Sequence, residues 1–198
     1  MQVNYSVYGY DANWQYPAIT EQHAFRQMKE IFSRKAINEQ VAYIGFPWAT
    51  LIDLKRQKAL QTERISELET ELAILVEQVG VRKKIITVCQ QVYALQFPRL
   101  FEFAGITDLF WTHATKNLPS IPQAPKTLIH PFPLYPVQQV AARLENINRP
   151  RDYLFSFVGA KSNDFYLTHS RNLIFRELGN HPRGMVVMRD LWHYNEIV

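Results

Sequence analysis

The sequence predicts an α/β fold in which a mostly parallel sheet carries helices on both faces. Short β-branched and aromatic runs alternate with longer amphipathic segments along the 198 residues. Hydrophobic residues make up 47% of the chain, enough to build a sizeable core. Near the C-terminal end an apolar run meets Gly159, and Arg171 follows at the start of a predicted helix. Strand, tight turn and helix N-terminus, in that order, form the anion sites of α/β proteins.

The N-terminal part begins with a predicted strand at residues 3–10 and a loop at residues 13–17. Thr20 is a suitable N-cap for a helix that runs to Arg34. The apolar residues of this helix recur at helical spacing on one stripe: Phe25, Met28, Ile31 and Phe32. Residues 41–46 then predict a buried second strand.

A long helix is predicted over residues 50–79, ending at Gly80 as a C-cap. Its apolar residues step by three and four and form a seam: Ile65, Leu68, Leu72, Leu75 and Val79. One interpretation, which we favour, is that the seam packs on the body of the protein. The other is that it forms an oligomer or partner surface.

The chain continues with a third strand at residues 84–89, a helix over 90–104 that bends or restarts at Pro98, and a fourth strand at 107–112. Leu128 and Ile129 begin a fifth strand. Residues 118–136 are rich in proline, which predicts extended chain or turns. A cleft edge or an interdomain connection is the natural use of such a segment.

A modest helix at residues 137–146 and a linker at 146–151 are predicted to separate two domains. Beyond the linker come a strand at 153–159, a helix at 168–178 and a strand at 185–188. The sequence thus predicts a Rossmann-like domain at residues 1–148 and the first βαβ portion of a second domain at 149–198.

Composition and missing motifs narrow the function classes. The net charge of +4 suits anionic ligands such as nucleotide-sugars, but basic residues are spread along the chain, with only short clusters such as 82–84, so no nucleic-acid partner is expected. No apolar run reaches eighteen residues and no signal peptide is apparent, so we expect no membrane span and a cytoplasmic protein. No P-loop, GxGxxG or metal-ligand spacing occurs. Cys89 is the only cysteine, and a buried structural thiol is favoured over a nucleophile.

Three segments, in order, resemble the exostosin-type glycosyltransferases, bacterial members in particular. They are residues 87–91 (TVCQQ), residues 106–116 (ITDLFWTHATK), and the stretch 151–172, where an aromatic-rich strand ends at Gly159 and Arg171 opens a helix. The resemblance covers roughly residues 84–178 and is strongest at the two ends of that range.

The resemblance implies a two-domain, GT-B-like enzyme that inverts the anomeric centre. The N-terminal half would hold a glycan acceptor and the second half the nucleotide-sugar donor, with no cofactor firmly implied beyond that donor substrate. The family carries a further arginine-rich turn and a helix glutamate that these 198 residues lack. The expectation is a chain truncated within its donor domain, with weak or no turnover unless a complementary donor-domain half is supplied.

A second function class stays open from the sequence. The aromatic content of 13% and the seam of residues 65–79 would also suit a non-catalytic carbohydrate- or protein-binding module, or a homo-oligomer.

For the donor, Gly159, Arg171 and Asn172 are the expected binding residues. A guanidinium at a helix N-terminus adds to the helix dipole, and a glycine allows the backbone to approach a phosphate. The alternatives are a surface arginine paired with Asp164 or Glu177, and an ordinary strand-ending turn.

For the catalytic base, the candidates are His113 and Asp108. His113 follows the carboxyl end of a strand, where parallel sheets bind ligands, whereas Asp108 begins that strand, so His113 is favoured. Lys116 and His130 are candidate substrate-binding residues. A histidine satisfied by a backbone carbonyl and a solvated lysine are the structural alternatives.

Overall fold

The computed structural model describes residues 6–16, 18–34, 40–57, 62–135, 150–161 and 169–190. Contacts divide the chain into a first unit, Met1–Gln138, and a second unit, Gln139–Val198, whereas the sequence places a boundary after residue 148. The helix predicted at 137–146, most of the linker, and Asp164 lie outside the described residues.

The first unit contains a six-stranded sheet with the order β1-β2-β3-β4-β6-β5. The five strands from β1 to β6 in this order are parallel to their neighbours, and only β5 is antiparallel, as the alternating pattern predicts. Their bounds are Val7–Gly9 (β1), Val41–Gly45 (β2), Lys84–Cys89 (β3), Asp108–Trp111 (β4), Ser120–Ile121 (β5) and Ala124–Pro131 (β6). The proline-rich segment therefore holds a two-residue strand, β5, that the sequence did not predict.

The helices of this unit are α1 (Thr20–Arg34), α2 (Trp48–Arg56), α3 (Thr62–Val79) and α4 (Pro98–Phe103), with a short 3₁₀ turn, η1, at Ala94–Gln96. The prediction of one helix over 50–79 is wrong, because α2 ends at Arg56 and α3 begins at Thr62. The predicted restart at Pro98 is confirmed: Pro98 occupies the first turn of α4, where its missing N–H costs nothing.

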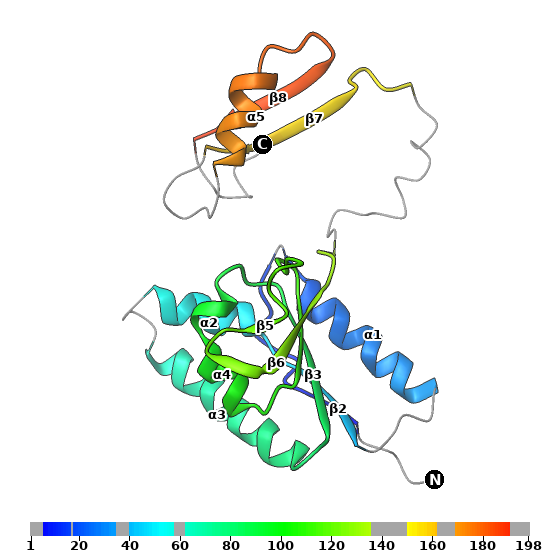
Figure 1. The fold of residues 1–198 in the computed structure, drawn as a ribbon, viewed down its shortest axis with the longest axis vertical. Coiled ribbons are helices and arrows are strands. Elements are labelled where there is room, and N and C mark those ends of the chain that lie inside the picture. The colour runs from blue at the N-terminus through cyan, green and yellow to red at the C-terminus, as the bar shows by residue number, and fades with distance from the viewer. Residues whose placement is uncertain are drawn as a thin grey trace. The chain divides into compact units, whose positions relative to one another are not determined.

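Helices cover both faces of the sheet, α1 on one and α2, α3 and α4 on the other (Figure 1). Successive side chains of β2 point to opposite faces of the sheet: Tyr43 packs on the α1 side, and Ala42 and Ile44 pack on the opposite side. The chain therefore leaves the carboxyl ends of β1 and β2 toward opposite faces. The two connections are β1–α1–β2 and β2–α2–α3–β3, and both lead to the next strand in the same direction across the sheet. Because their helices lie on opposite faces, the two crossovers have opposite handedness.

Two glycines let α1 approach the sheet closely. A Cβ at Gly9 would lie 2.3 Å from the Phe25 ring, and a Cβ at Gly45 would lie 2.2 Å from it. Phe25 is 1% exposed, so its ring fills the space that these missing side chains leave above β1 and β2.

The seam of α3 packs on the body of the first unit. Leu68, Leu72, Leu75 and Val79 are at most 4% exposed and belong to the main core cluster, against which Ile65 packs. The partner or oligomer interpretation of this seam is therefore wrong, because these side chains are already buried. Gly80 follows α3 with φ +61°, the left-handed conformation of a glycine C-cap.

The second unit pairs two parallel strands, β7 (Phe155–Ala160) and β8 (Gly184–Arg189), connected through α5 (Ser170–Leu178). Phe157 on β7 contacts Phe175 on α5 with ring centroids 5.4 Å apart, which holds the helix on one face of the pair. These elements match the predicted strand, helix and strand. Among the described residues of both units, no helix is long and apolar enough to cross a membrane.

Candidate functional site

The predicted anion-binding residues of the second unit lie together. The Arg171 guanidinium rests against the end of β7, so that a Cβ at Gly159 would be 2.9 Å from Nη1. The same Nη1 donates a hydrogen bond to the Ala160 carbonyl at 3.4 Å. Gly159 is buried, whereas Arg171 and Asn172 are half-buried. The glycine thus leaves the space in which a cation sits beside the strand end.

This cation also lies at the beginning of a helix. Arg171 and Asn172 are the second and third residues of α5, and His169 at the N-cap makes no side-chain capping bond. The first turn of a helix carries a partial positive charge. A guanidinium, a helix N-terminus and a glycine that is the second-last residue of β7, one residue before the strand ends, are therefore combined in one place, which suits a phosphate group.

His113 lies at the carboxyl edge of the first unit's sheet, two residues after β4. Its Nδ1 is 2.8 Å from the Thr112 hydroxyl, which in turn donates to the Gln90 carbonyl at 3.2 Å. With that hydroxyl donating to Gln90, Nδ1–H is the donor to Thr112 and Nε2 is the nitrogen with the lone pair. Partial burial lowers the pKa of His113, so the ring is neutral at pH 7 and can accept a proton.

A buried polar network that the sequence did not predict supports this edge. It joins the loop before α1, the starts of α1 and α2, and the segment after β3, through the side chains of Gln15, Glu21, Asp53, Gln90 and Gln91. The one sequence signal for it is the pair of glutamines directly after a buried strand.

Glu21 is the most buried member of the network, at 2% exposure. Its Oε1 accepts from the Gln90 backbone N–H at 2.9 Å, and both of its oxygens lie 3.2 Å from the Ala49 N–H in the first turn of α2. Burial raises the pKa of Glu21 to about 8, outweighing the two backbone N–H groups that lower it. Glu21 therefore ties α1, α2 and the end of β3 together as a protonated acid at neutral pH.

Asp53 completes the network from α2. Gln15 and Gln91 each donate a side-chain N–H to one of its two carboxyl oxygens, both at 2.6 Å. Burial raises the pKa of Asp53, while the Gln15 hydrogen bond and the Arg56 charge oppose that rise. Because both oxygens are already engaged, Asp53 is a positioning group.

The network continues to β4 through two backbone carbonyls. The Gln91 carbonyl accepts from the Trp111 indole N–H at 2.8 Å, and the Gln90 carbonyl accepts from Thr112. The Trp111 ring also lies 5.7 Å from the His113 ring, centroid to centroid. The position of His113 therefore depends on side chains that lie far from it in the sequence.

Asp108 and His130, predicted for separate roles, form a pair. His130 Nε2 lies 2.8 Å from Asp108 Oδ1, which also pairs with Lys84 Nζ at 3.1 Å, while Oδ2 accepts from the Thr107 hydroxyl. Burial alone would raise the pKa of Asp108, but the hydrogen bonds from Thr107, Lys84 and His130 together hold it below its usual range. Asp108 is thus a buried carboxylate at the amino end of β4.

Lys116 and Cys89 are the remaining residues with a predicted role. Lys116 is exposed in the loop after β4. Cys89 is buried, and burial raises its pKa well above the usual value, as expected of a structural thiol. Within the described ranges, no three His, Cys, Asp or Glu side chains are grouped so as to hold a metal ion.

Comparisons with known proteins identify no relative of the chain. No protein-family model matches the chain, and neither a curated protein nor a solved structure matches it significantly.

Proposed function

We propose that the protein is of the glycosyltransferase type, transferring a sugar from a nucleotide-sugar donor to a saccharide acceptor with inversion. The observation that carries the proposal is the packing of Arg171 on Gly159 at the start of α5. In this proposal Arg171, with Asn172 beside it, binds the donor diphosphate and stabilises the negative charge that the leaving group gains. The resemblance of residues 87–91, 106–116 and 151–172 to exostosin-type enzymes supports the same assignment.

The proposal includes a two-domain, GT-B-like organisation with the acceptor held by the first unit. The parallel sheet of this unit supports that role, since such sheets bind ligands outside their carboxyl edge. His113 lies at this edge with a neutral ring and a lone pair on Nε2. It is the better base for an acceptor hydroxyl than Asp108, whose oxygens are held by Thr107, Lys84 and His130.

A thermal-stability titration with nucleoside diphosphates tests the donor site. A ligand that binds only the folded state stabilises it by about 2.7 kcal/mol at one hundred times its Kd. We expect at least one diphosphate of the panel to raise the unfolding midpoint of the full chain. Arg171→Ala should abolish that rise, because it removes the cation beside Gly159.

Arg176→Ala is the matched control, since Arg176 lies on the same helix but is exposed and pairs with Glu177. It should keep the rise. If no diphosphate shifts the midpoint at millimolar concentration, or if Arg171→Ala retains the shift, the proposed donor site is wrong.

The transfer step has a separate test. A radiolabelled sugar nucleotide that matches the tightest diphosphate is incubated with the full chain and a set of oligosaccharide acceptors. Product that depends on Arg171 and falls at least about a hundredfold in His113→Gln supports both assignments, since general-base effects are about 10²–10⁴-fold. Turnover is expected to be weak in these 198 residues, so the assay is repeated with a complementary donor-domain half; diphosphate binding without transfer in both assays would instead favour a non-catalytic binding module.

A further inference from the structure

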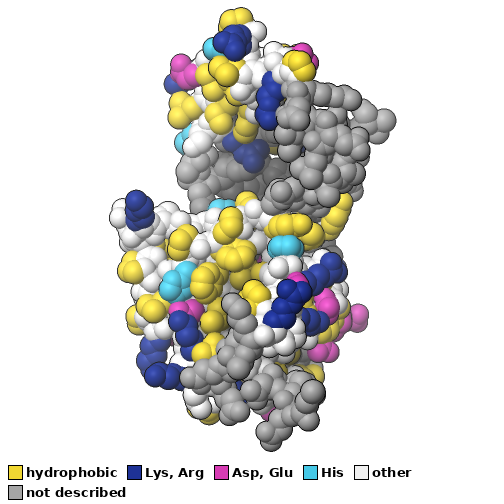
Figure 2. All heavy atoms as spheres, turned by 90° about the vertical axis from the view of Figure 1, so that its right-hand side faces the viewer, with side chains coloured by type: hydrophobic (Ala, Val, Ile, Leu, Met, Phe, Trp, Pro, Cys, Tyr) yellow, Lys and Arg dark blue, Asp and Glu magenta, His cyan; other side chains and the backbone are white. Residues whose placement is uncertain are grey.

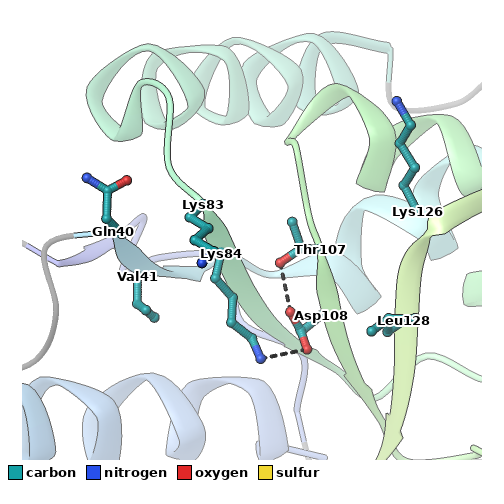
Figure 3. A pocket seen from close by; sticks show the side chains of 8 residues that line it. All are labelled: Gln40, Val41, Lys83, Lys84, Thr107, Asp108, Lys126 and Leu128. Carbon is teal, nitrogen blue, oxygen red and sulfur yellow. Dashed lines mark hydrogen bonds and ion pairs between the residues drawn. The ribbon is translucent and has the colours of Figure 1, made fainter.

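A hollow with a basic rim lies at the amino edge of the first unit's sheet, opposite the edge that carries His113. Its volume is about 380 Å³. It is lined by residues from four neighbouring strands and the turns before them: Gln40, Val41, Lys83, Lys84, Thr107, Asp108, Lys126 and Leu128 (Figure 3). None of the groups proposed for sugar transfer except Asp108 belongs to this lining.

The three side chains of the short basic cluster at residues 82–84 differ in their partners. Arg82 donates to the Tyr8 hydroxyl on β1, and Lys84 extends to Asp108, as Figure 3 shows. Lys83 lies on the side of the hollow near Gln40, and Lys126 rises from β6 on the other side. Neither Lys83 nor Lys126 forms an ion pair with a described residue.

The one acid in the lining does not neutralise these two lysines. Asp108 Oδ1 is held by Lys84 and His130, and Oδ2 accepts from Thr107. The lining therefore has three lysines against one carboxylate, and the local charge is +2 at pH 7. Lys and Arg side chains lie at several separate places on the face that Figure 2 presents.

The hollow also has an apolar part. Leu128 lies beside Asp108 on the adjoining strand and is 47% exposed, and Val41 at the start of β2 is half-buried. An exposed leucine next to lysines with no ion pair favours a ligand with an anionic group and an apolar body.

From these observations we infer that the amino-edge hollow is a binding site for a small organic oxyanion, a phosphate or a carboxylate. Lys83 and Lys126, on opposite sides of the hollow, supply the positive charge that attracts the anionic group, and Val41 and Leu128 contact the apolar part. Lys84 stays on Asp108, which fixes the floor of the site. This site is independent of the proposed donor site, because it lies wholly within the first unit.

The test uses amide-resolved NMR of the full, isotope-labelled chain at constant ionic strength, so that each site is observed separately. Phenyl phosphate, benzoate and inorganic phosphate are the probes. We expect the first two to shift the amides of Val41, Lys84 and Thr107. The tighter of the two identifies phosphate or carboxylate as the preferred group, and phenyl phosphate should bind about fivefold tighter than inorganic phosphate through its buried ring.

The double variant Lys83→Gln/Lys126→Gln should weaken the tighter probe about tenfold, as expected for losing two positive charges near the anion in a solvent-exposed hollow. Arg99→Gln removes one exposed positive charge elsewhere on the first unit and should leave the affinity unchanged. Equal unfolding midpoints for the variants show that the fold is kept. The inference is overturned if these amides do not shift at probe concentrations up to about 50 mM, which corresponds to the weakest affinity worth assigning. It is also overturned if the double variant binds the probe with the affinity of the wild-type chain.

Discussion

The guanidinium of Arg171 occupies the space that a side chain at residue 159 would fill, since a Cβ at Gly159 would lie 2.9 Å from Nη1. Gly159 and Arg171 are twelve positions apart, on β7 and α5, and their packing brings a cation to the end of a strand and the start of a helix. This arrangement is the physical basis for the proposed diphosphate site.

Gly159→Ala tests that packing without removing the charge. The new methyl group would push the guanidinium away from the strand end, because the Phe157 ring, 3.0 Å from the same Cβ, also leaves it little room. We expect nucleoside diphosphate affinity to fall about tenfold, roughly the 1.4 kcal/mol of a displaced charge-assisted contact. Isothermal titration measures it, and unchanged affinity would show that the position of Arg171 does not matter for binding.

Gly45→Ala should destabilise the first unit. The Cβ would lie 2.2 Å from the ring of Phe25, which is buried and cannot swing away as an exposed side chain would. Overpacking of this kind costs about 1–3 kcal/mol, and urea unfolding measures it.

Phe25→Leu in the Gly45→Ala background supplies the control. It should recover part of the loss, because the smaller side chain makes room for the methyl group. Equal stability of Gly45→Ala and the wild-type chain would contradict the close packing of α1 on β2.

The buried acid Glu21 gives a pH dependence of stability. Its pKa is about 8 in the folded chain and 4.5 when unperturbed, so the folded state binds more protons between these values. Stability is therefore highest below pH 4.5 with respect to this group and falls as pH rises toward 8. The slope is at most about 1.4 kcal/mol per pH unit.

Glu21→Gln removes the titration but keeps an oxygen for the N–H groups of Ala49 and Gln90. Its stability from pH 5 to 8 should decline less steeply than that of the wild-type chain, as measured by urea unfolding at each pH. Glu30→Gln, on the exposed part of α1, serves as the control and should keep the wild-type slope. Parallel curves for Glu21→Gln and wild type would rule out a proton held at Glu21.

The single thiol should be unreactive in the folded chain. Cys89 is 0% exposed and burial raises its pKa, so little thiolate is present at pH 8. A thiol reagent such as Ellman's reagent should label less than a tenth of the chain in the time that labels it fully in 6 M urea, about the denaturant needed to unfold a small domain. Rapid labelling of the native chain would place Cys89 at the surface.

The sequence predicted the elements whose signals are local. The predicted start at Thr20 and the apolar stripe that includes Phe25 match the bounds of α1, although Thr20 is the first helical residue and its hydroxyl accepts from the Tyr135 N–H instead of capping the helix. Gly80 marked the end of α3. The break between α2 and α3 was missed because both helices bury their apolar residues on the same core, so the periodicity continues across it. The strand β5 was missed because two residues carry no periodicity.

Some groups of the candidate sites also have a local sequence signal, whereas others are brought together only by the fold. Gly159 and Arg171 could be predicted together because the strand–turn–helix order is local. The pairing of Asp108 with His130 depends on the register of β4 against β6, and the contact between Glu21 and Gln90 joins residues 69 positions apart. Only the folded chain brings these groups together.

The most direct test of the proposed donor site is equilibrium binding of the most stabilising nucleoside diphosphate to three proteins: wild type, Arg171→Ala and Arg176→Ala. We predict measurable affinity for wild type, a loss of at least tenfold in Arg171→Ala, and wild-type affinity in Arg176→Ala, which removes an equal charge from the same helix. Equal affinity in all three proteins, or no binding to wild type, would contradict a diphosphate site at Arg171 and Gly159.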